Sequence, residues 1–433
     1  MIARILALVL TLAVAPAFAI PEIQHWTTGN GARVYFVHAP ELPMVDVQIA
    51  FDAGSARDGE RHGLALLTNG LLSEGAGEWD ADAIAARFEG VGANFGNAAG
   101  RDMATLGLRS LTDPAKLEQA LATLEAIVER PTFPADAFER ERSRLLVAIE
   151  RRAQDPGAQA DLAFYRALYG EHPYAHPPEG EKATVAALTR DDLIAFYRRF
   201  YVARNAVVAI VGALDRRQAE AIAERLTDQL PAGEAAPPLP PVPDLETARE
   251  VRIDFPSTQT HILMGQPGVY RGDPDYFPLF VGNQILGGAA LVSRIFDEVR
   301  EKRGLAYSAY SYFRPMRRRG PFVAGLQTRN DQAGQALEVL RGTIARFVAE
   351  GPTEAELAAA KSNLVGGFPL RIDTNKKILG YVTMIGFYGM PLDYLQRFTE
   401  HVQAVTLEQV RDAFARRIHP DRMVTVIVGR PGR

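Results

Sequence analysis

The chain has 433 residues, of which 47% are hydrophobic, so it can build a sizeable core and is too long for one typical domain. Its net charge is −4 and its pI about 6.1, which excludes the electrostatic footprint of a nucleic-acid-binding protein. It has no cysteine, so thiolate nucleophiles and cysteine zinc sites are excluded as well. One short basic block, Arg317 to Arg319, is interpreted as a solvated loop.

Residues 1–19 have the pattern of a secretory signal peptide. Arg4 supplies a positive charge, residues 5–15 are apolar, and residues 17–19 read AFA, a small-x-small cleavage site. The apolar run is shorter than the about 20 residues that span a bilayer. We therefore expect cleavage after Ala19, a periplasmic mature protein and no membrane span after cleavage. An uncleaved anchor is the alternative.

The first half of the mature chain mixes strand and helix patterns. Alternating apolar residues predict strands at 33–38 and 45–51. Helices are expected at 79–88, 114–130 and 138–152. Residues 91–108 are rich in glycine and alanine and are interpreted as a single strand.

Two segments, residues 188–212 and 405–429, match each other without a gap. Each begins with a Thr N-cap and an acidic residue, continues as a helix, and ends in a β-branched strand followed by Gly. This pattern indicates a duplicated helix–strand unit. The proline-rich residues 231–244 are expected to be an extended, semi-rigid linker rather than a core element. They separate an N-terminal domain, 20–230, from a C-terminal domain, 245–433.

Neither half has regular βαβ spacing. We therefore expect an α+β fold made of two homologous α/β sandwich domains. Each would contain an antiparallel or mixed sheet with helices on one face.

Several segments, taken together, point to a known family. Residues 51–58 read FDAGSARD and residues 62–65 read HGLA, while residues 170–180 read GEHPYAHPPEG. Residues 286–308 read LGGAALVSRIFDEVREKRGLAYS. With the glycine- and alanine-rich strand at Gly92, they resemble the pitrilysin/insulinase superfamily, especially its mitochondrial-processing-peptidase-like branch. The resemblance implies a clamshell of two halves that pairs with a like subunit around a chamber.

The resemblance also implies how peptides bind. Unfolded peptides would add a strand to a sheet edge, which gives main-chain affinity with little sequence preference. Here the edge strand would run from Asn94 to Leu108, where small residues let a backbone approach closely. Its substrate-binding residues would be Asn94, Phe95, Gly96 and Asn97. The alternative is a glycine-rich strand that simply bends.

The zinc motif of this family is missing. Catalytic members carry His-x-x-Glu-His on a helix, in which the histidines bind zinc and the glutamate polarises water. Residues 63–75 read GLALLTNGLLSEG, so Leu66, Asn69 and Gly70 occupy the three positions. Leucine cannot ligate zinc, asparagine is not a base at neutral pH, and glycine has no side chain. Glu150 lies near the position of a later family glutamate, but one carboxylate does not hold zinc.

Other histidines do not replace the motif. His172 and His176 are four residues apart, but Pro173 and Pro177 prevent a regular helix, so the spacing does not place them on one face. We interpret them as loop histidines that fix a turn. We therefore expect no metal in this chain, and the resemblance implies that zinc is supplied by a partner subunit.

Arg300 and Tyr307 are the candidate catalytic residues. In the family, an Arg and a Tyr at this spacing donate hydrogen bonds to the substrate carbonyl and to the charge that develops on it. A guanidinium is always charged and a phenol is a rigid donor, so both suit an oxyanion. Gly304 would end the helix and turn the tyrosine towards the site. The alternative is a solvated charged face followed by an ordinary strand.

Three functions remain open at this point. The first is the zinc-less subunit of a periplasmic heterodimeric metallopeptidase, whose homologous partner carries His-x-x-Glu-His. The second is a non-catalytic peptide-binding or scaffold protein of the same fold. The third is a self-sufficient peptidase with an unusual metal site.

Overall fold

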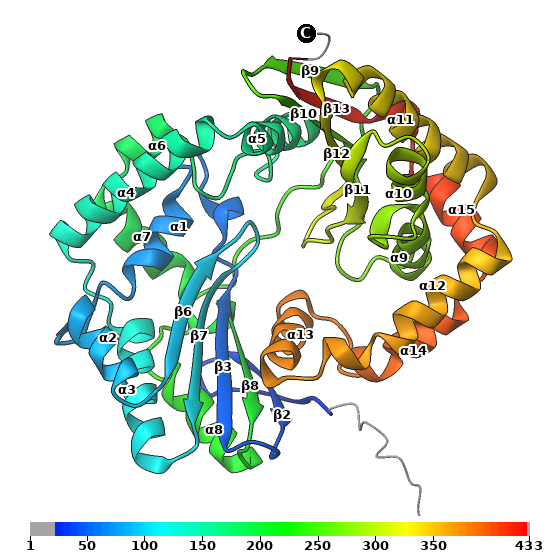
Figure 1. Cartoon of the computed structure of the whole chain (residues 1–433). Helices are drawn as coiled ribbons and strands as arrows, with labels where there is room; N and C mark the ends of the chain where they lie inside the picture. The colour runs from blue at the N-terminus through cyan, green and yellow to red at the C-terminus, as the bar shows by residue number, and fades with distance from the viewer. Residues whose placement is uncertain (1–21, 431–433) are drawn as a thin grey trace, which may run out of the picture.

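The computed structural model describes residues 22–430, so the expected signal peptide lies outside the described residues. The chain forms two large mixed sheets with helices around them (Figure 1). The first sheet contains β1 (Gln24–Thr27), β2 (Arg33–His38), β3 (Met44–Phe51), β6 (Asn94–Ala99), β7 (Ala104–Leu111) and β8 (Ala206–Gly212). The second sheet contains β9 (Arg249–Asp254), β10 (Gln259–Pro267), β11 (Ala306–Phe313), β12 (Pro321–Arg329) and β13 (Val424–Gly429). A small ribbon pairs β4 (Gly75–Ala76) with β5 (Trp79–Asp80).

Helices fill the segments between the strands. In the first half they are α1 (Leu64–Leu71), α2 (Ala81–Glu89), α3 (Pro114–Glu129), α4 (Ala135–Ala153), α5 (Pro156–Tyr169), α6 (Lys182–Ala187), α7 (Arg190–Phe200) and α8 (Arg216–Arg225). In the second half they are α9 (Tyr276–Asn283), α10 (Arg294–Phe296), α11 (Ala333–Glu350), α12 (Glu354–Gly366), α13 (Asn375–Tyr388), α14 (Tyr394–Ala404) and α15 (Leu407–Arg417). The α+β class and the pair of sandwiches are confirmed.

The two halves repeat one topology. The first sheet has the order β1-β2-β8-β3-β7-β6, and the second has the order β9-β13-β10-β12-β11 when it is written from the corresponding end. In each half one pair is parallel, β2 with β8 and β9 with β13, and the other pairs are antiparallel. The matched segments form α7–β8 and α15–β13, and Thr189 and Thr406 both close a capping box. The duplication thus extends from the sequence match to the whole sheet.

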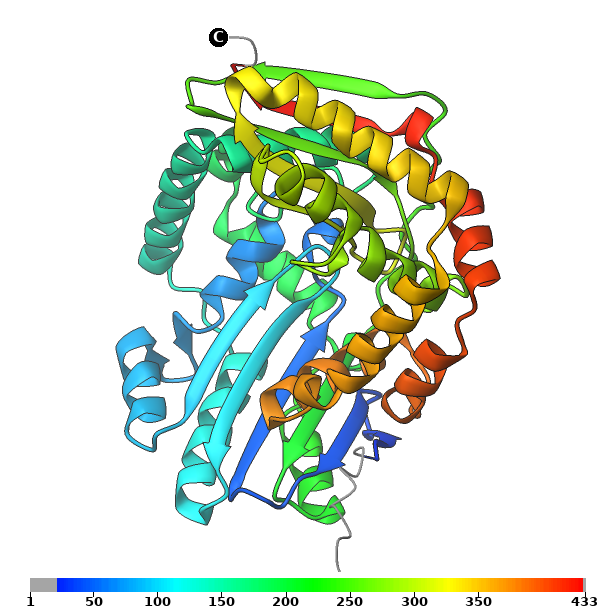
Figure 2. The same ribbon diagram turned by 45° about the vertical axis from the view of Figure 1, so that its right-hand side comes forward.

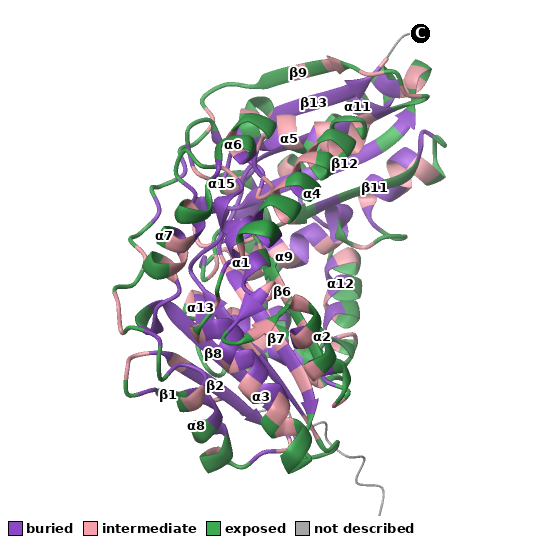
Figure 3. Cartoon of the chain, turned by 90° about the vertical axis from the view of Figure 1, so that its left-hand side faces the viewer, coloured by how far each residue is buried: buried purple, intermediate pink, exposed green. Residues whose placement is uncertain are grey.

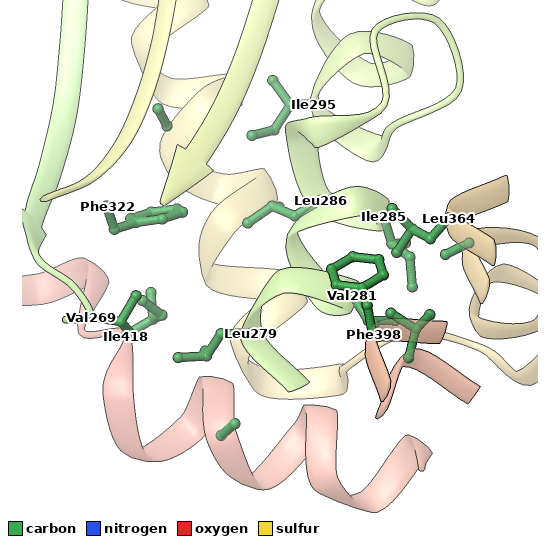
Figure 4. Close-up of a cluster of buried hydrophobic side chains, with 14 of the residues drawn as sticks. Val269, Leu279, Val281, Ile285, Leu286, Ile295, Phe322, Leu364, Phe398 and Ile418 are labelled. Carbon is green, nitrogen blue, oxygen red and sulfur yellow. The ribbon is translucent and has the colours of Figure 1, made fainter. Parts of the chain in front are cut away.

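Each sheet packs one face on the helices of its own half. Val47, Ile49 and Leu106 belong to the core between the first sheet and its helices. The second sheet meets α9, α11 and α15 through a core that includes Leu279, Leu286 and Phe322 (Figure 4). The inner strands β8, β10 and β13 are almost wholly buried, whereas edge strand β9 is largely exposed (Figure 3).

The other face of each sheet is covered by a helix from the opposite half. Helix α5 packs on β10 and β13, and α13 packs on β2, β3 and β8 (Figures 1 and 2). Gly386 makes the second contact possible, because a Cβ there would lie 2.6 Å from the Tyr35 ring. Polar bonds add to it, since the Thr383 hydroxyl donates to Gln48 at 2.8 Å and Arg33 donates to the Gly386 carbonyl at 3.0 Å. The halves are therefore interlocked.

The basic block is not the solvated loop that was expected. The Arg317 backbone N–H donates to Asp102 at 2.8 Å, and its guanidinium pairs with Asp52 at 3.2 Å. Buried Asp102 also accepts from the hydroxyls of Tyr174 and, at 2.8 Å, Tyr388 of α13. The loop carrying Arg317 thus fastens the second half to the first, because these partners lie on several different segments.

The proline-rich linker is more than a spacer. Residues 231–244 form neither helix nor strand, as expected, but Leu239 and Val242 are buried in the core beneath α5. The guanidinium groups of Arg318 and Arg319 donate to the carbonyls of these two residues. The expectation that the linker is no core element is therefore wrong for these two side chains.

Two element boundaries also differ from the prediction. The expected strand over 91–108 is a hairpin, in which β6 is the sheet edge and β7 is internal, because the chain reverses at residues 100–103. The expected helix 79–88 begins at Ala81, since Trp79 and Asp80 are in β5 and the Asp80 side chain caps the helix. Both differences have a local cause: a turn at residues 100–103 divides the strand, and the Asp80 cap sets the start of the helix.

Candidate functional site

Arg300 and Tyr307 lie side by side at the exposed edge of the second sheet. The guanidinium carbon of Arg300 is 4.5 Å from the centre of the Tyr307 ring, and it also lies 4.9 Å from the Phe296 ring. Tyr307 is the second residue of edge strand β11 and is 83% exposed. Within the described residues its hydroxyl has no hydrogen-bond partner. Arg300 is half-buried, and its Nε lies 3.8 Å from a carboxylate oxygen of Glu301. The pair thus presents a stacked cation and a free phenol to a ligand.

The helical segment before Tyr307 is firmly held. Leu286 and Ile295 anchor it in the core (Figure 4), and Arg294 forms an ion pair with Glu356 at 2.7 Å. A single π-helical turn, Asp297–Glu301, carries Arg300. These contacts fix the backbone from which Arg300 projects.

Gly304 ends this helical segment as predicted. Its φ is +60°, and its N–H donates to the Arg300 carbonyl at 2.8 Å. Residues other than glycine rarely adopt this left-handed conformation. The turn brings the chain back so that Tyr307 reaches Arg300.

An apolar loop adjoins the pair in the sequence. Leu291 and Val292 are 70% and 84% exposed, although both are hydrophobic. They precede α10, which packs on β11. Exposed large apolar side chains beside a candidate site are typical of a binding surface.

Helix α1 carries the three positions of the lost zinc motif. Leu66 is half-buried, Asn69 is buried, and Gly70 faces open space, where a Cβ would meet no atom within 4 Å. Asp58 caps the helix by accepting from the backbone N–H groups of Gly63 and Ala65, each at 2.8 Å. Burial raises the pKa of Asp58 to about 8, against the effect of these two donors. The helix is intact, but its side chains do not fit zinc.

Asn69 has become a structural residue. Its side-chain amide donates to the Tyr201 hydroxyl at 3.2 Å, and its backbone carbonyl accepts from Asn97 of β6 at 2.8 Å. The position of the family's general base therefore ties the helix to the edge strand. An amide held in this way cannot take a proton from water.

Residues 22–430 contain no group of three or more His, Asp or Glu side chains that could hold a metal ion. Glu150 is an exposed partner of Lys182, with 2.6 Å between the charged atoms. This ion pair makes Glu150 part of the solvated surface of α4. It provides no carboxylate for a zinc site.

The two loop histidines hold turns, as predicted. His172 accepts from the Tyr174 N–H at 3.1 Å, and its other ring nitrogen lies 3.1 Å from the Pro240 carbonyl. His176 bonds to the Ser55 carbonyl at 3.0 Å and stacks on the His62 ring at 3.8 Å. Burial lowers the pKa of His176 to about 4, so it is neutral at physiological pH.

A groove lies along the edge of the first sheet. Its volume is about 530 Å³, and β3, β6, β7 and α13 line it, with Asn94, Phe95 and Gly96 among the lining residues. Its floor carries a bidentate ion pair between Arg109 and Asp46, with bonds of 2.8 and 3.1 Å. The fourth predicted residue, Asn97, is turned towards α1 instead. Three of the four peptide-binding candidates therefore share one cavity, and they lie on a different sheet from the Arg–Tyr pair.

Sequence reasoning missed the second wall of this groove. Lys376, Leu379 and Gly380 of α13 face the edge strand from the other half of the chain. The apolar periodicity of α13, which includes Ile378, Val382 and Ile385, is consistent with a helix that buries one face, but it does not show which sheet covers that face. No sequence signal identified these residues.

The fold and site define a class: a peptidase-like chain with an intact motif helix that carries no zinc ligand at its three motif positions. Residues 33–180 match the model for the insulinase family, peptidase family M16, and residues 187–364 match that of the M16 inactive domain. A crystal structure from Pseudomonas fluorescens, described as a peptidase M16 inactive domain, has a TM-score of 0.92 and 43% identity. The match covers 95% of this chain and 98% of that one. This chain belongs to peptidase family M16.

More distant relatives agree with this assignment. An uncharacterized zinc protease of Mycobacterium leprae is 28% identical over 93% of this chain and 91% of its own length. A Helicobacter pylori protein named as the non-peptidase homolog YmxG is 26% identical over 88% of this chain and 89% of its own length. The names thus span both kinds of member, and this chain is of the inactive-domain type.

From residue 22 to residue 430, the helices are all too short or too polar to cross a bilayer.

Proposed function

We propose that this chain is the zinc-less subunit of a periplasmic heterodimeric metallopeptidase. A homologous partner supplies His-x-x-Glu-His and zinc. This chain supplies Arg300, Tyr307 and half of the peptide chamber. The observation that carries the proposal is the contrast between the two sites: half-buried Arg300 stacks on exposed Tyr307, whereas the zinc positions are Leu66, Asn69 and Gly70.

The chemistry of the pair supports this division of labour. A charged guanidinium and a phenol hydroxyl stabilise a developing oxyanion without proton transfer. The 4.5 Å stacking distance keeps Tyr307 beside Arg300 even though the ring is exposed. The groove at β6 supports a peptide-binding role, because an edge strand offers free backbone donors and acceptors.

The test is reconstitution with a zinc-motif homologue from the same organism. We expect the two chains to co-elute, and the mixture to cleave unfolded peptides faster than the partner alone. Tyr307→Phe removes one oxyanion donor, which lowers kcat by about 10². Assembly, measured by native mass spectrometry, remains intact.

Tyr270→Phe is the matched control, since it removes a phenol that is 40% exposed and lies outside the pair. It leaves kcat unchanged. The proposal is wrong if the mixture cleaves no faster than the partner alone.

The named non-peptidase relative favours a second candidate, a peptide-binding scaffold. In that case the chain binds unfolded peptides, but no partner gains activity from it. A homodimer in native mass spectrometry, together with peptide binding that does not depend on Tyr307, would support the scaffold.

A further inference from the structure

A second cavity opens where α13 meets α9, α14 and the turn Pro369–Arg371. Its volume is about 560 Å³. Its charged lining residues are Arg271, Arg371 and Lys377, with no aspartate or glutamate. Its rings are those of Tyr276, Tyr381, Tyr394 and Phe398. Positive charge between aromatic walls suits an anion attached to an apolar body. We call this cavity the Tyr–Arg pocket.

The two arginines of the pocket are not neutralised by the protein. Lys377 pairs with Asp373 at 2.8 Å. In residues 22–430, Arg271 and Arg371 have no carboxylate within ion-pair distance, and the buried Nε of Arg271 has no hydrogen-bond acceptor. A buried donor without an acceptor is rare in native proteins and costs stability. The Arg271 guanidinium therefore lines the cavity without a counter-ion from the described part of the protein.

The Tyr–Arg pocket adjoins the groove at β6. Gly380 of α13 lines both cavities, and a Cβ built there meets no atom within 4 Å. Glycine inside a helix is destabilising relative to alanine. Gly380 therefore lowers the stability of α13 but leaves free space between the two cavities. Between the two cavities, Gly380 therefore presents no side chain to an extended peptide that crosses α13.

We propose that the Tyr–Arg pocket binds a carboxylate of the peptide that lies in the groove, with Arg271 as its principal ligand. The guanidinium fork matches a carboxylate geometrically, and the rings pack on the adjoining apolar side chain. This inference rests on the proposed peptide-binding role. The carboxylate comes from either the C-terminus or an acidic side chain near it.

The first experiment tests the pocket by itself, with a ligand too small to need the groove. N-acetylphenylalanine and its amide are titrated against the full chain by NMR. We expect the acid to bind at least about tenfold more tightly than the amide, because a charged hydrogen bond is lost in the amide. Arg271→Gln and Arg371→Gln each reduce this preference, whereas Arg198→Gln, an exposed arginine on α7, does not. Equal affinity for acid and amide, or tighter binding of inorganic phosphate, would overturn the inference.

The second experiment uses one unfolded peptide in three forms: a free C-terminus, a C-terminal amide, and an amide preceded by glutamate. Tight binding of the first form alone assigns the C-terminal carboxylate, and tight binding of the first and third assigns any nearby carboxylate. Gly380→Leu blocks the crossing and removes the discrimination. Gly342→Leu on α11, where a Cβ also meets no atom within 4 Å, is the control. If all three forms bind equally, this inference fails and the peptide-binding role stands. If none binds while the small acid still does, the peptide-binding role fails and the pocket stands.

Discussion

Gly70 occupies the last position of the zinc motif on helix α1, where there is room for a side chain. A Cβ there meets no atom within 4 Å, and the residue is exposed. Gly70→Ala should therefore stabilise the protein by about 0.5 to 1 kcal/mol, because alanine loses less backbone entropy in a helix. Urea unfolding of the two proteins measures the difference, and a loss of stability would contradict it.

A substitution at the neighbouring Asn69 should lower the stability of the protein rather than raise it. Asn69→Glu places a carboxylate where the Tyr201 hydroxyl now accepts a bond, in a buried position. An unpaired buried charge is costly, so we expect a loss of about 2 to 4 kcal/mol in the free energy of unfolding. Urea unfolding measures it, with Asn69→Ala as the control that loses the bond to Tyr201 without adding a charge. A change below about 1 kcal/mol would mean that the site tolerates a base.

His176 should make the protein sensitive to acid. Burial lowers its pKa to about 4 in the fold, whereas a histidine in an unfolded chain has a pKa near 6.5. Below about pH 6.5 the unfolded state takes up a proton that the folded state does not. The stability contributed by His176 is thus complete above pH 6.5 and is lost as the pH falls through 4, by about 3 kcal/mol.

His176→Gln removes this titration and keeps a donor for the Ser55 carbonyl. The free energy of unfolding, followed by urea titration from pH 7 to pH 4, should fall less steeply in the variant. His25→Gln changes an exposed histidine and serves as the control. Parallel curves for the parent and His176→Gln would contradict the assignment.

At the scale of elements, helices α5 and α13 each cover the sheet of the other half. Each sheet therefore depends on the other half of the sequence for its stability. Phe164 of α5 is fully buried against the second sheet, where Gly265 leaves room for its ring. Phe164→Ala should cost about 3 to 5 kcal/mol, because it removes a large side chain from a packed core. Hydrogen exchange should show the loss of protection at β10 and β13, although Phe164 lies in the first half of the chain.

Val147→Ala, on the exposed face of α4, is the control and should change stability by less than about 0.5 kcal/mol. Loss of protection confined to the first sheet would show that α5 does not support the second one.

For the whole molecule, the packing of α5 and α13 on opposite sheets predicts that neither half folds alone. A fragment 22–230 retains α5 without the sheet it covers, and a fragment 245–430 retains α13 in the same state. Each fragment also exposes the sheet face that the other helix buries. Co-expressed fragments should associate and unfold in one cooperative transition, followed by circular dichroism. A cooperative unfolding transition for either fragment by itself would show that the halves are independent.

Much of this architecture was readable from residues alone. The Thr caps and β-branched runs of the two matched segments predicted α7–β8 and α15–β13, because capping and strand propensity are local. The missing zinc ligands are likewise a statement about side-chain chemistry at Leu66, Asn69 and Gly70. The turn at Gly304 followed from the freedom of glycine at positive φ.

The sequence by itself determined the α+β class, the duplicated helix–strand unit and the absence of the zinc motif, since each depends on short-range pattern or on residue identity. Only the tertiary structure decided that α5 and α13 each cover the sheet of the other half, that Arg317 fastens the halves, and that Gly380 lines two cavities. The reason is physical. An amphipathic pattern requires that a helix bury one face, but burial is non-directional, so either of two similar sheets satisfies it until the whole chain is assembled.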